Sequence, residues 1–570
     1  MTRDAQLAMR LAMGVLLTGW STSSRAQLPP RQQSPYQRLS RQKLARTLQK
    51  LQMGTLLEEL ANQTKDDSLL VEALLFRADS APADQRDELL VQAAELVRNQ
   101  YMELEKTIEE TRRKNSDAYE QALINYYKTR LRYVEIQALR RGKPFIDRLL
   151  MMMGGKEDRK ALLALTGEAV KSLDNIEQKL QRILSDSRGR AELQVYLVLE
   201  LEDIRDQLEF SSAKVRYYSA ISRPRVFPDK KTNQQRLELL IRATRDIQKF
   251  TEKADYGVQG YARLLQARCY REQEQFEKAA EMLDSAVAGQ SRKEVLIEAL
   301  FEVARNKIEQ AALRMRDKEN ENRVQTGNEA FDEARKAVDT FAVQARKVHP
   351  QLGVDIKTFV LRHYLYERWA AALRSAEQAA QAEEHDKNAQ QAFLEFLEKY
   401  KAPAIRAAVG KLFREKLRGG KIDLQTTDPV IVLLLATLEM NEANDLQDER
   451  DWNDLSQDQK DRIRRREDRA REMFEHVRKN SPPTARNAVA SALWNLGVIH
   501  VKQMENFKAA EMFRELVSRF PKHKQAYTAA LNAVKITSAL IGDLVERGKP
   551  ISRRRRIQFV ESLRGMLDNW

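Results

Sequence analysis

Apolar residues recur along most of the chain at steps of three and four positions, which is the period of one face of an α-helix. The clearest faces are carried by Leu173, Ile176, Leu180 and Ile183, and by Leu193, Leu197, Leu201, Ile204 and Leu208. No run of alternating β-branched and polar residues is long enough to predict a sheet. The pattern therefore predicts an all-α protein built from long amphipathic helices.

A second pattern places small and aromatic residues across two consecutive helices. Starting from a small residue, matching positions follow at offsets of 3, 12, 16 and 19. They are Ala267, Tyr270, Ala279, Leu283 and Ala286, with Phe276 between them, and again Gly497, His500, Ala509, Phe513 and Leu516. Two antiparallel helices approach closely only where side chains are small. The spacing therefore predicts two helix-turn-helix units that bury these positions at their crossings.

The second helix of this unit occurs once more. Ala470, Phe474, Val477 and Pro482 repeat the spacing of Ala509, Phe513, Leu516 and Pro521. The proline ends each helix because it pushes the residue before it out of the α region. A further candidate for a repeat helix is formed by Phe331, Ala334, Val338 and Phe341.

At these residues the sequence resembles the tetratricopeptide repeat family, whose unit is a pair of antiparallel helices. The resemblance implies a right-handed solenoid of stacked pairs, because one pair cannot bury its apolar face alone. It also implies that another protein binds on a concave surface lined mainly by the first helix of each pair. The exposed first-helix positions that it offers as partner contacts are Arg263, Gln266, Asn495 and Lys502.

Prolines and glycines divide the chain into blocks. We predict a signal peptide at 1–26, a linker at 27–40, an N-terminal helical block at 41–222 and a linker at 223–233, followed by central repeats at 234–422 and C-terminal repeats at 423–570. Residues 441–460 are acidic and polar, and we interpret them as an insertion between two helices of a repeat. The block 41–222 either continues the array or forms a separate bundle.

The first 26 residues have the features of a secretory signal peptide. Arg3 and Arg10 charge the start, and Leu11–Trp20 is an apolar core too short to span a bilayer. Ser24 and Ala26 supply small residues for cleavage before Gln27. We therefore expect an exported protein, periplasmic or associated with a bacterial cell envelope, without a transmembrane span in the mature chain.

Composition supports long helices and a basic surface. The 570 residues include only 20 glycines and 14 prolines, and 98 basic against 83 acidic residues give a net charge of +15. The densest basic patch comprises Arg547, Lys549, Arg553, Arg554, Arg555 and Arg556. Most of the charge is interleaved in sign, as on solvated helices. The basic excess leaves room for an acidic polysaccharide or an anionic surface as partner, whereas nucleic acid is not expected outside the cytoplasm.

Nothing in the sequence indicates a reaction. The six histidines lack the spacing that puts two metal ligands on one helical face, and no glycine-rich phosphate-binding motif occurs. The single cysteine, Cys269, excludes an internal disulfide and is interpreted as a buried thiol. Met151–Met153 either fill core at a helix end or form an exposed binding spot. We assign no catalytic, cofactor or metal residues.

Three functions remain open at this stage. We favour a non-enzymatic protein-interaction scaffold in the cell envelope. The alternatives are a polyanion- or surface-binding module that acts through the basic patches, and an enzyme whose site in a helical toroid is not recognisable from sequence.

Overall fold

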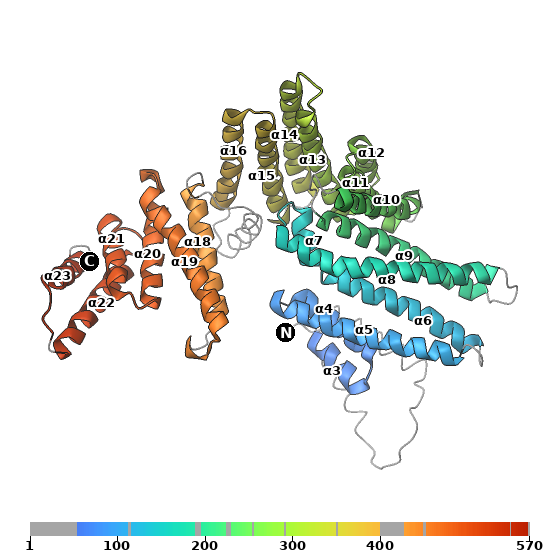
Figure 1. Cartoon of the computed structure of the whole chain (residues 1–570), viewed down its shortest axis with the longest axis horizontal. Helices are drawn as coiled ribbons and strands as arrows, with labels where there is room; N and C mark the ends of the chain where they lie inside the picture. The colour runs from blue at the N-terminus through green and yellow to red at the C-terminus, as the bar shows by residue number, and fades with distance from the viewer. Residues whose placement is uncertain are drawn as a thin grey trace, which may run out of the picture. The chain divides into compact units, whose positions relative to one another are not determined.

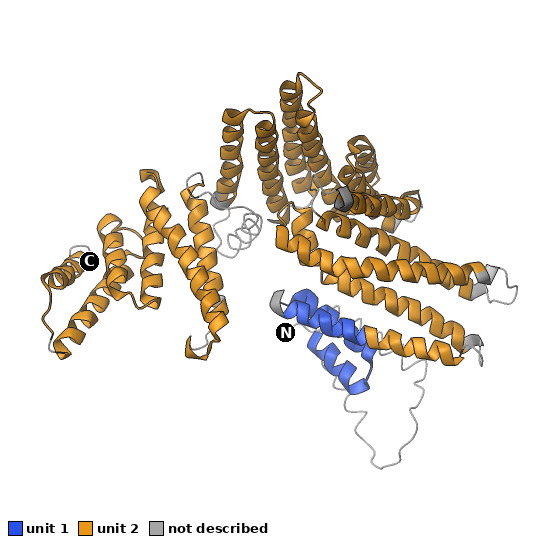
Figure 2. Cartoon of the chain, in the orientation of Figure 1, with its two compact units in different colours: residues 1–97 blue, residues 98–570 orange. Residues whose placement is uncertain are grey.

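The computed structural model describes residues 54–81, 83–111, 116–188, 195–223, 230–252, 256–289, 292–348, 352–399, 424, 427–447, 452–547 and 549–567. Every regular element within these ranges is helical, so the prediction of an all-α protein is confirmed (Figure 1). The predicted signal peptide and linker at 1–40 lie outside the described residues. The chain forms two compact units, residues 1–97 and 98–570 (Figure 2).

The first unit contains α3 (Gly54–Thr64), α4 (Asp67–Ser80) and the first part of α5 (Ala83–Thr111). Leu57 on α3 and Ala73 on α4 are fully buried against each other in a small core. Asp66 caps α4, because its side chain accepts a hydrogen bond of 3.1 Å from the backbone N–H of Leu69.

The second unit begins with long helices. They are the rest of α5, then α6 (Ser116–Val134), a π-helical turn at Glu135–Arg140, α7 (Lys143–Leu150), α8 (Lys156–Arg188), α9 (Val195–Ser222) and α10 (Lys230–Glu252). Leu193 lies outside the described residues. The rest of the two apolar faces found in the sequence meets in one core between α8 and α9, where Leu173, Ile176, Leu201 and Leu208 are at most 1% exposed. Packing continues into α10, because Arg216 of α9 forms a buried ion pair with Asp246 of α10.

Antiparallel helix pairs follow. They are α11 (Tyr256–Glu272) with α12 (Phe276–Ala288), α13 (Lys293–Arg316) with α14 (Arg323–Val348), α15 (Leu352–Ser375) with α16 (Ala379–Lys399), α18 (Pro429–Gln447) with α19 (Gln457–Asn480), α20 (Arg486–Lys502) with α21 (Asn506–Arg519), and α22 (Ala526–Glu546) with α23 (Arg553–Leu567). First helices of neighbouring pairs also touch, as α13 does with α15 and α18 with α20. This is the stacking of a tetratricopeptide-like solenoid.

Two details of the predicted organisation can be compared with the helices. Much of 441–460, interpreted from sequence as an insertion, is helical, because α18 runs to Gln447 and α19 begins at Gln457 behind a capping box at Ser456. The candidate helix at Phe331 is the second helix of a pair, α14, and all four of its marker residues are at most 1% exposed. The block boundaries at 223–233 and 422 stay predictions.

Candidate partner-binding surfaces

Small residues lie at the helix crossings of both units found in the sequence. Gly497 on α20 faces the ring of Phe513 on α21 so closely that a Cβ at 497 would be 2.4 Å from Phe513 Cε1. In the other unit, Ala267 and Ala279 are at most 1% exposed. The positions Phe276, Leu283, Ala286, Ala470, Phe474, Val477, His500, Ala509, Phe513 and Leu516 are likewise buried, and Tyr270 is half-buried.

One tight turn joins the helices of both units. Glu274 and Met504 adopt left-handed φ angles of 63° and 59°. The next residue donates its backbone N–H to the carbonyl five positions earlier, at 2.9 Å for Gln275 to Tyr270 and 2.8 Å for Glu505 to His500. This is the hydrogen bond of a helix C-terminal cap that usually contains glycine.

The same turn reveals a repeat that the sequence pattern missed. Glu377, between α15 and α16, has φ 64°, and Gln378 donates to the Leu373 carbonyl at 2.9 Å. Counting from Ala370, the offsets of 12 and 19 fall on Ala382 and Ala389, which are at most 4% exposed, as is Ala370. The offset of 16 falls on the polar Asp386, which forms an ion pair with Arg374. The small residues at 370, 382 and 389 were the signal that could have found this pair.

The four predicted contact residues have different environments. Lys502 is exposed, and its Nζ donates to Asn444 on the neighbouring first helix α18, while Asn495 is half-buried. Arg263 is half-buried and donates to the Ser285 carbonyl of its own unit at 3.2 Å. The expectation that Gln266 is exposed is wrong, because its side chain is only 3% exposed. Helix α11 packs against α9, α10, α12 and α13, which leaves few outward positions.

Charged side chains on α11 and α13 are buried in an ion network. Glu302 is fully buried, and its carboxylate accepts hydrogen bonds from Arg268, at 2.6 Å, and from Arg271. Burial alone would raise the pKa of Glu302, but the charges of Arg271, Arg268 and Arg305 outweigh it and hold the pKa well below its usual range. These first-helix side chains hold neighbouring helices together and are closed to a partner.

The turn between α7 and α8 covers part of the same first helices. Met153 is 1% exposed and packs with Phe359 and Val360 of α15 and with residues of α16 and α18. Arg305 of α13 donates to the Leu150 carbonyl at 3.1 Å. The methionine run is therefore core filling, and α13 and α15 present less free surface than their place in the repeat implies.

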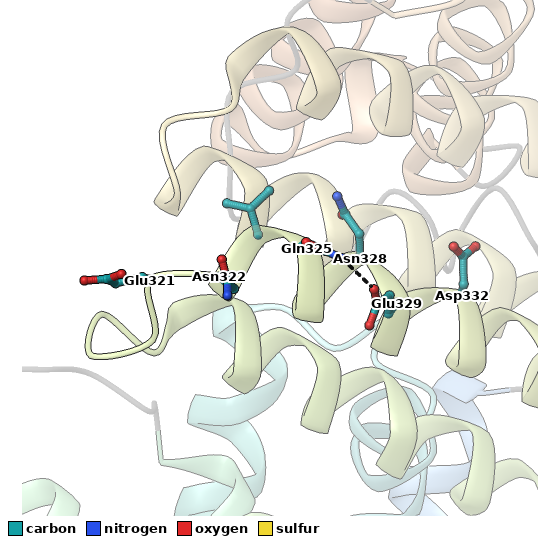
Figure 3. Close-up of a pocket in the computed structure, with 7 residues that line it drawn as sticks. Glu321, Asn322, Gln325, Asn328, Glu329 and Asp332 are labelled. Atoms are coloured by element: carbon teal, nitrogen blue, oxygen red, sulfur yellow. Dashed lines mark hydrogen bonds between the residues drawn. The ribbon is translucent and has the colours of Figure 1, made fainter.

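Two of the open cavities on the helix pairs bear on partner binding. The first, of 490 Å³, follows the turn before α14 and its first turns, and Figure 3 shows Gln325 donating to Glu329 within it. All its lining residues, including Glu321 and Asp332, belong to 321–332. Helix α15 reaches its edge, where Trp369 donates to Asn328 at 2.7 Å. The second, of 750 Å³, lies at the starts of α18 and α20 and is lined by Val430, Thr484, Ala485, Arg486, Asn487, Ala488, Ala490, Phe520, Pro521, Lys522 and His523. Its lining contains basic and apolar residues and no acidic residue.

The basic patch lies at the C-terminal helix pair. Arg553, Arg554 and Arg556 are exposed and Arg555 is half-buried, with Arg554 and Arg555 over the ring of Phe507. Arg547 and Lys549 precede α23 and are exposed, and Arg547 pairs with Asp543 at 2.7 Å. The preceding helix, α22, has the length and composition to cross a membrane, but Ala526, Ala529, Ala530 and Ala533 on its first half are buried in the repeat core.

The described residues show no assembled reactive centre. Cys269 is fully buried, and burial raises the pKa of its thiol to about 12, so the nucleophilic thiolate does not form near neutral pH. His385 stacks on Trp369 with ring centroids 4.1 Å apart, and His500 bonds Glu505 at 2.6 Å. Within the described ranges no three histidine, cysteine or acidic side chains gather as metal ligands would.

Comparison with known proteins supports the repeat assignment. The family model described as tetratricopeptide repeat matches residues 261–288 and 491–523. These ranges are the two helix-turn-helix units with the small-residue crossings.

The chain carries tetratricopeptide repeats at these two ranges.

The matched ranges cover α11–α12 and α20–α21, and the tetratricopeptide-like pairs α13–α14, α15–α16 and α18–α19 lie between them. Among solved structures, the crystal structure of yeast Tom70 is similar over 88% of this chain and 97% of its own, at 13% identity and a TM-score of 0.15. A TM-score this low carries no argument about fold or function. No curated protein matches the chain.

Proposed function

We propose that this chain is a non-enzymatic scaffold that binds another protein on the first helices of its C-terminal repeats, α18 and α20. The observation that carries the proposal is the contrast between the two groups of repeats. On α11, α13 and α15 the first-helix side chains are tied up in the Glu302 ion network and covered by Met153. On α20, Lys502 is exposed and Asn495 is half-buried.

The cavity between the starts of α18 and α20 also supports a partner-binding site on these two helices. It combines the apolar Val430 and Phe520 with the cations of Arg486 and Lys522. Protein interfaces use this combination of an aromatic or aliphatic anchor with arginine. A segment of a protein partner that carries an acidic residue beside an apolar one fits this lining.

Photo-crosslinking tests the surface directly. A photoreactive amino acid replaces Asn495 or Lys502 on α20 in the full chain, and matched controls replace the exposed Lys508 or Glu511 on the second helix α21. The proposal expects the same crosslinked protein from both α20 positions and not from α21. Equal crosslinking from both helices, or crosslinking from α21 alone, would contradict it. Deletion of 483–570, which removes α20, should abolish capture of the same protein by the chain in a pull-down.

We also propose that the protein is exported into a bacterial cell envelope. The support is the charged start, the apolar core of Leu11–Trp20 and the small residues before Gln27. N-terminal sequencing of the protein from its native cells should begin at Gln27. A mature protein that retains the apolar core in the soluble cytoplasmic fraction would refute export.

A further inference from the structure

Helix α23 has an outward face that alternates arginines with exposed apolar side chains. Arg553, Ile557, Val560, Arg564 and Leu567 follow at helical steps of three and four, and all are exposed. Ile557 and Val560 are each 45% exposed and Leu567 is 73% exposed. Arg556 lies beside them on the same face. These exposed apolar side chains are not part of the described repeat core.

The orientation of α23 is fixed by its opposite face. Gln558 and Ser562 are 8% and 2% exposed, and Arg514 of α21 donates to the Gln558 carbonyl at 3.2 Å. The apolar residues Phe559, Leu563 and Met566 are half-buried. The helix thus docks through Gln558, Ser562 and Met566, which packs against the core of the C-terminal repeats, and its arginine and aliphatic face is turned to the outside.

The outward face is strongly positive. Between 547 and 567 the chain contains seven basic residues and one acidic residue, Glu561. That glutamate is exposed at the border of the outward face, one helical turn from Ile557 and Arg564, and pairs with Arg514 at 3.3 Å. Arg553, Arg556 and Arg564 make no ion pair with a described residue. Their charge is therefore available to an external anion.

We propose that the outward face of α23 binds the surface of a membrane that contains anionic phospholipid. Arginines would contact the headgroups while Ile557, Val560 and Leu567 enter the boundary between headgroups and acyl chains, the arrangement of an interfacial amphipathic helix. A soluble polyanion uses the charges but gains nothing from the aliphatic side chains. A second copy of this face would bring like charges together. This function is separate from partner binding on α18 and α20.

The test is vesicle flotation of the full chain at low and high salt. One vesicle contains phosphatidylcholine alone, and the other contains phosphatidylcholine with about a quarter phosphatidylglycerol. Three variants are compared: Arg553→Gln/Arg556→Gln/Arg564→Gln, Ile557→Ser/Val560→Ser, and the control Arg462→Gln/Arg464→Gln/Arg465→Gln on α19. The control arginines are exposed, but no exposed apolar residue lies on α19.

Binding is expected for the anionic vesicle only. Each arginine near an anionic leaflet contributes about 1 kcal/mol to binding. The α23 variant that lacks three arginines should therefore bind about a hundredfold more weakly. The aliphatic variant should bind roughly tenfold more weakly because it loses the insertion of apolar side chains. The α19 control should change binding by less than about threefold.

Three outcomes overturn the proposal. They are absence of anionic-vesicle binding by the unaltered chain, an aliphatic variant that binds as well as the unaltered chain, and an α19 control that loses as much as the α23 variant. The second outcome would assign the patch to a purely electrostatic partner such as an acidic polysaccharide. All altered side chains on the outward face are exposed, and circular dichroism should show unchanged helix content.

Discussion

Gly497 offers the sharpest test of how the repeat is packed. A Cβ at this position would lie 2.4 Å from Phe513 Cε1 and 2.7 Å from Cζ. The ring is 1% exposed and has Trp494 against it with centroids 5.4 Å apart, so it has little room to move. Overpacking of this kind costs about 3 kcal/mol at its upper end, and replacing glycine by alanine in a helix returns about 1 kcal/mol. We therefore expect Gly497→Ala to destabilise α20–α21 by about 2 kcal/mol.

Two companion variants make the reasoning refutable. At Gly542 in α22 an added Cβ meets nothing within 4 Å, so Gly542→Ala should stabilise by up to about 1 kcal/mol. In a Phe513→Ala background all three clashing ring atoms are removed, and Gly497→Ala should become neutral or stabilising. Hydrogen exchange of the α20–α21 amides in the full chain measures the local free energy of opening. The packing explanation is refuted if Gly497→Ala stabilises as Gly542→Ala does, or if the Phe513→Ala background leaves its cost unchanged.

The other predictions concern the turn, the ion network and the thiol. Met504 is 83% exposed and has a left-handed φ of 59°, which is strained for a residue with a side chain. Met504→Gly should therefore stabilise the α20–α21 turn by about 1 kcal/mol in the same exchange experiment. A lower stability of the glycine variant would contradict the strain. Glu302→Gln removes the only fully buried carboxylate of the network, leaves Arg268 and Arg271 with the more exposed Glu298 and Glu272, and should cost about 3 kcal/mol in urea denaturation. Because the folded pKa of Glu302 is depressed, its stabilisation is present above the unfolded pKa of about 4.3 and should be lost as pH falls below it; the Gln variant should lack this acid-dependent loss. Cys269 should react with a thiol reagent only when α11 opens, so urea should accelerate labelling strongly, whereas fast labelling of the native chain would refute its burial.

The sequence was informative wherever packing is local. Gly497 and Ala509 identify a helix crossing because close approach demands small side chains at a fixed separation. Helix turns also follow from short-range signals. The α15–α16 pair escaped the same search because Asp386 occupies a position where the other units have Leu283 and Phe513. An ion pair with Arg374 replaces the apolar contact there, and residue type alone cannot show that substitution.

Features that depend on distant neighbours were not predictable. The sequence alone suggests a solvent-exposed helix face for Arg268, Arg271 and Glu302. Only the stacking of α13 on α11 buries them in a network. Gln266 was mistaken for an exposed position for the same reason. A search for charged residues at core-facing steps of the helix would have flagged the arginines. It would not have identified their carboxylate, which is more than thirty positions away.

The turn between α7 and α8 makes the repeat array depend on contacts between units that are distant in the sequence. In a simple array each unit touches only the next, so units can be trimmed from either end one at a time. Here the hydrogen bond from Arg305 to Leu150 spans 155 positions, and Met153 belongs to one apolar cluster with residues of α15, α16 and α18. A fragment that begins after Arg223 lacks the α7–α8 turn. It would expose to water the buried surface of α13 and α15 that this turn covers. The smallest fragment of this region that folds on its own is therefore determined by the contact with the α7–α8 turn and not by the length of one repeat.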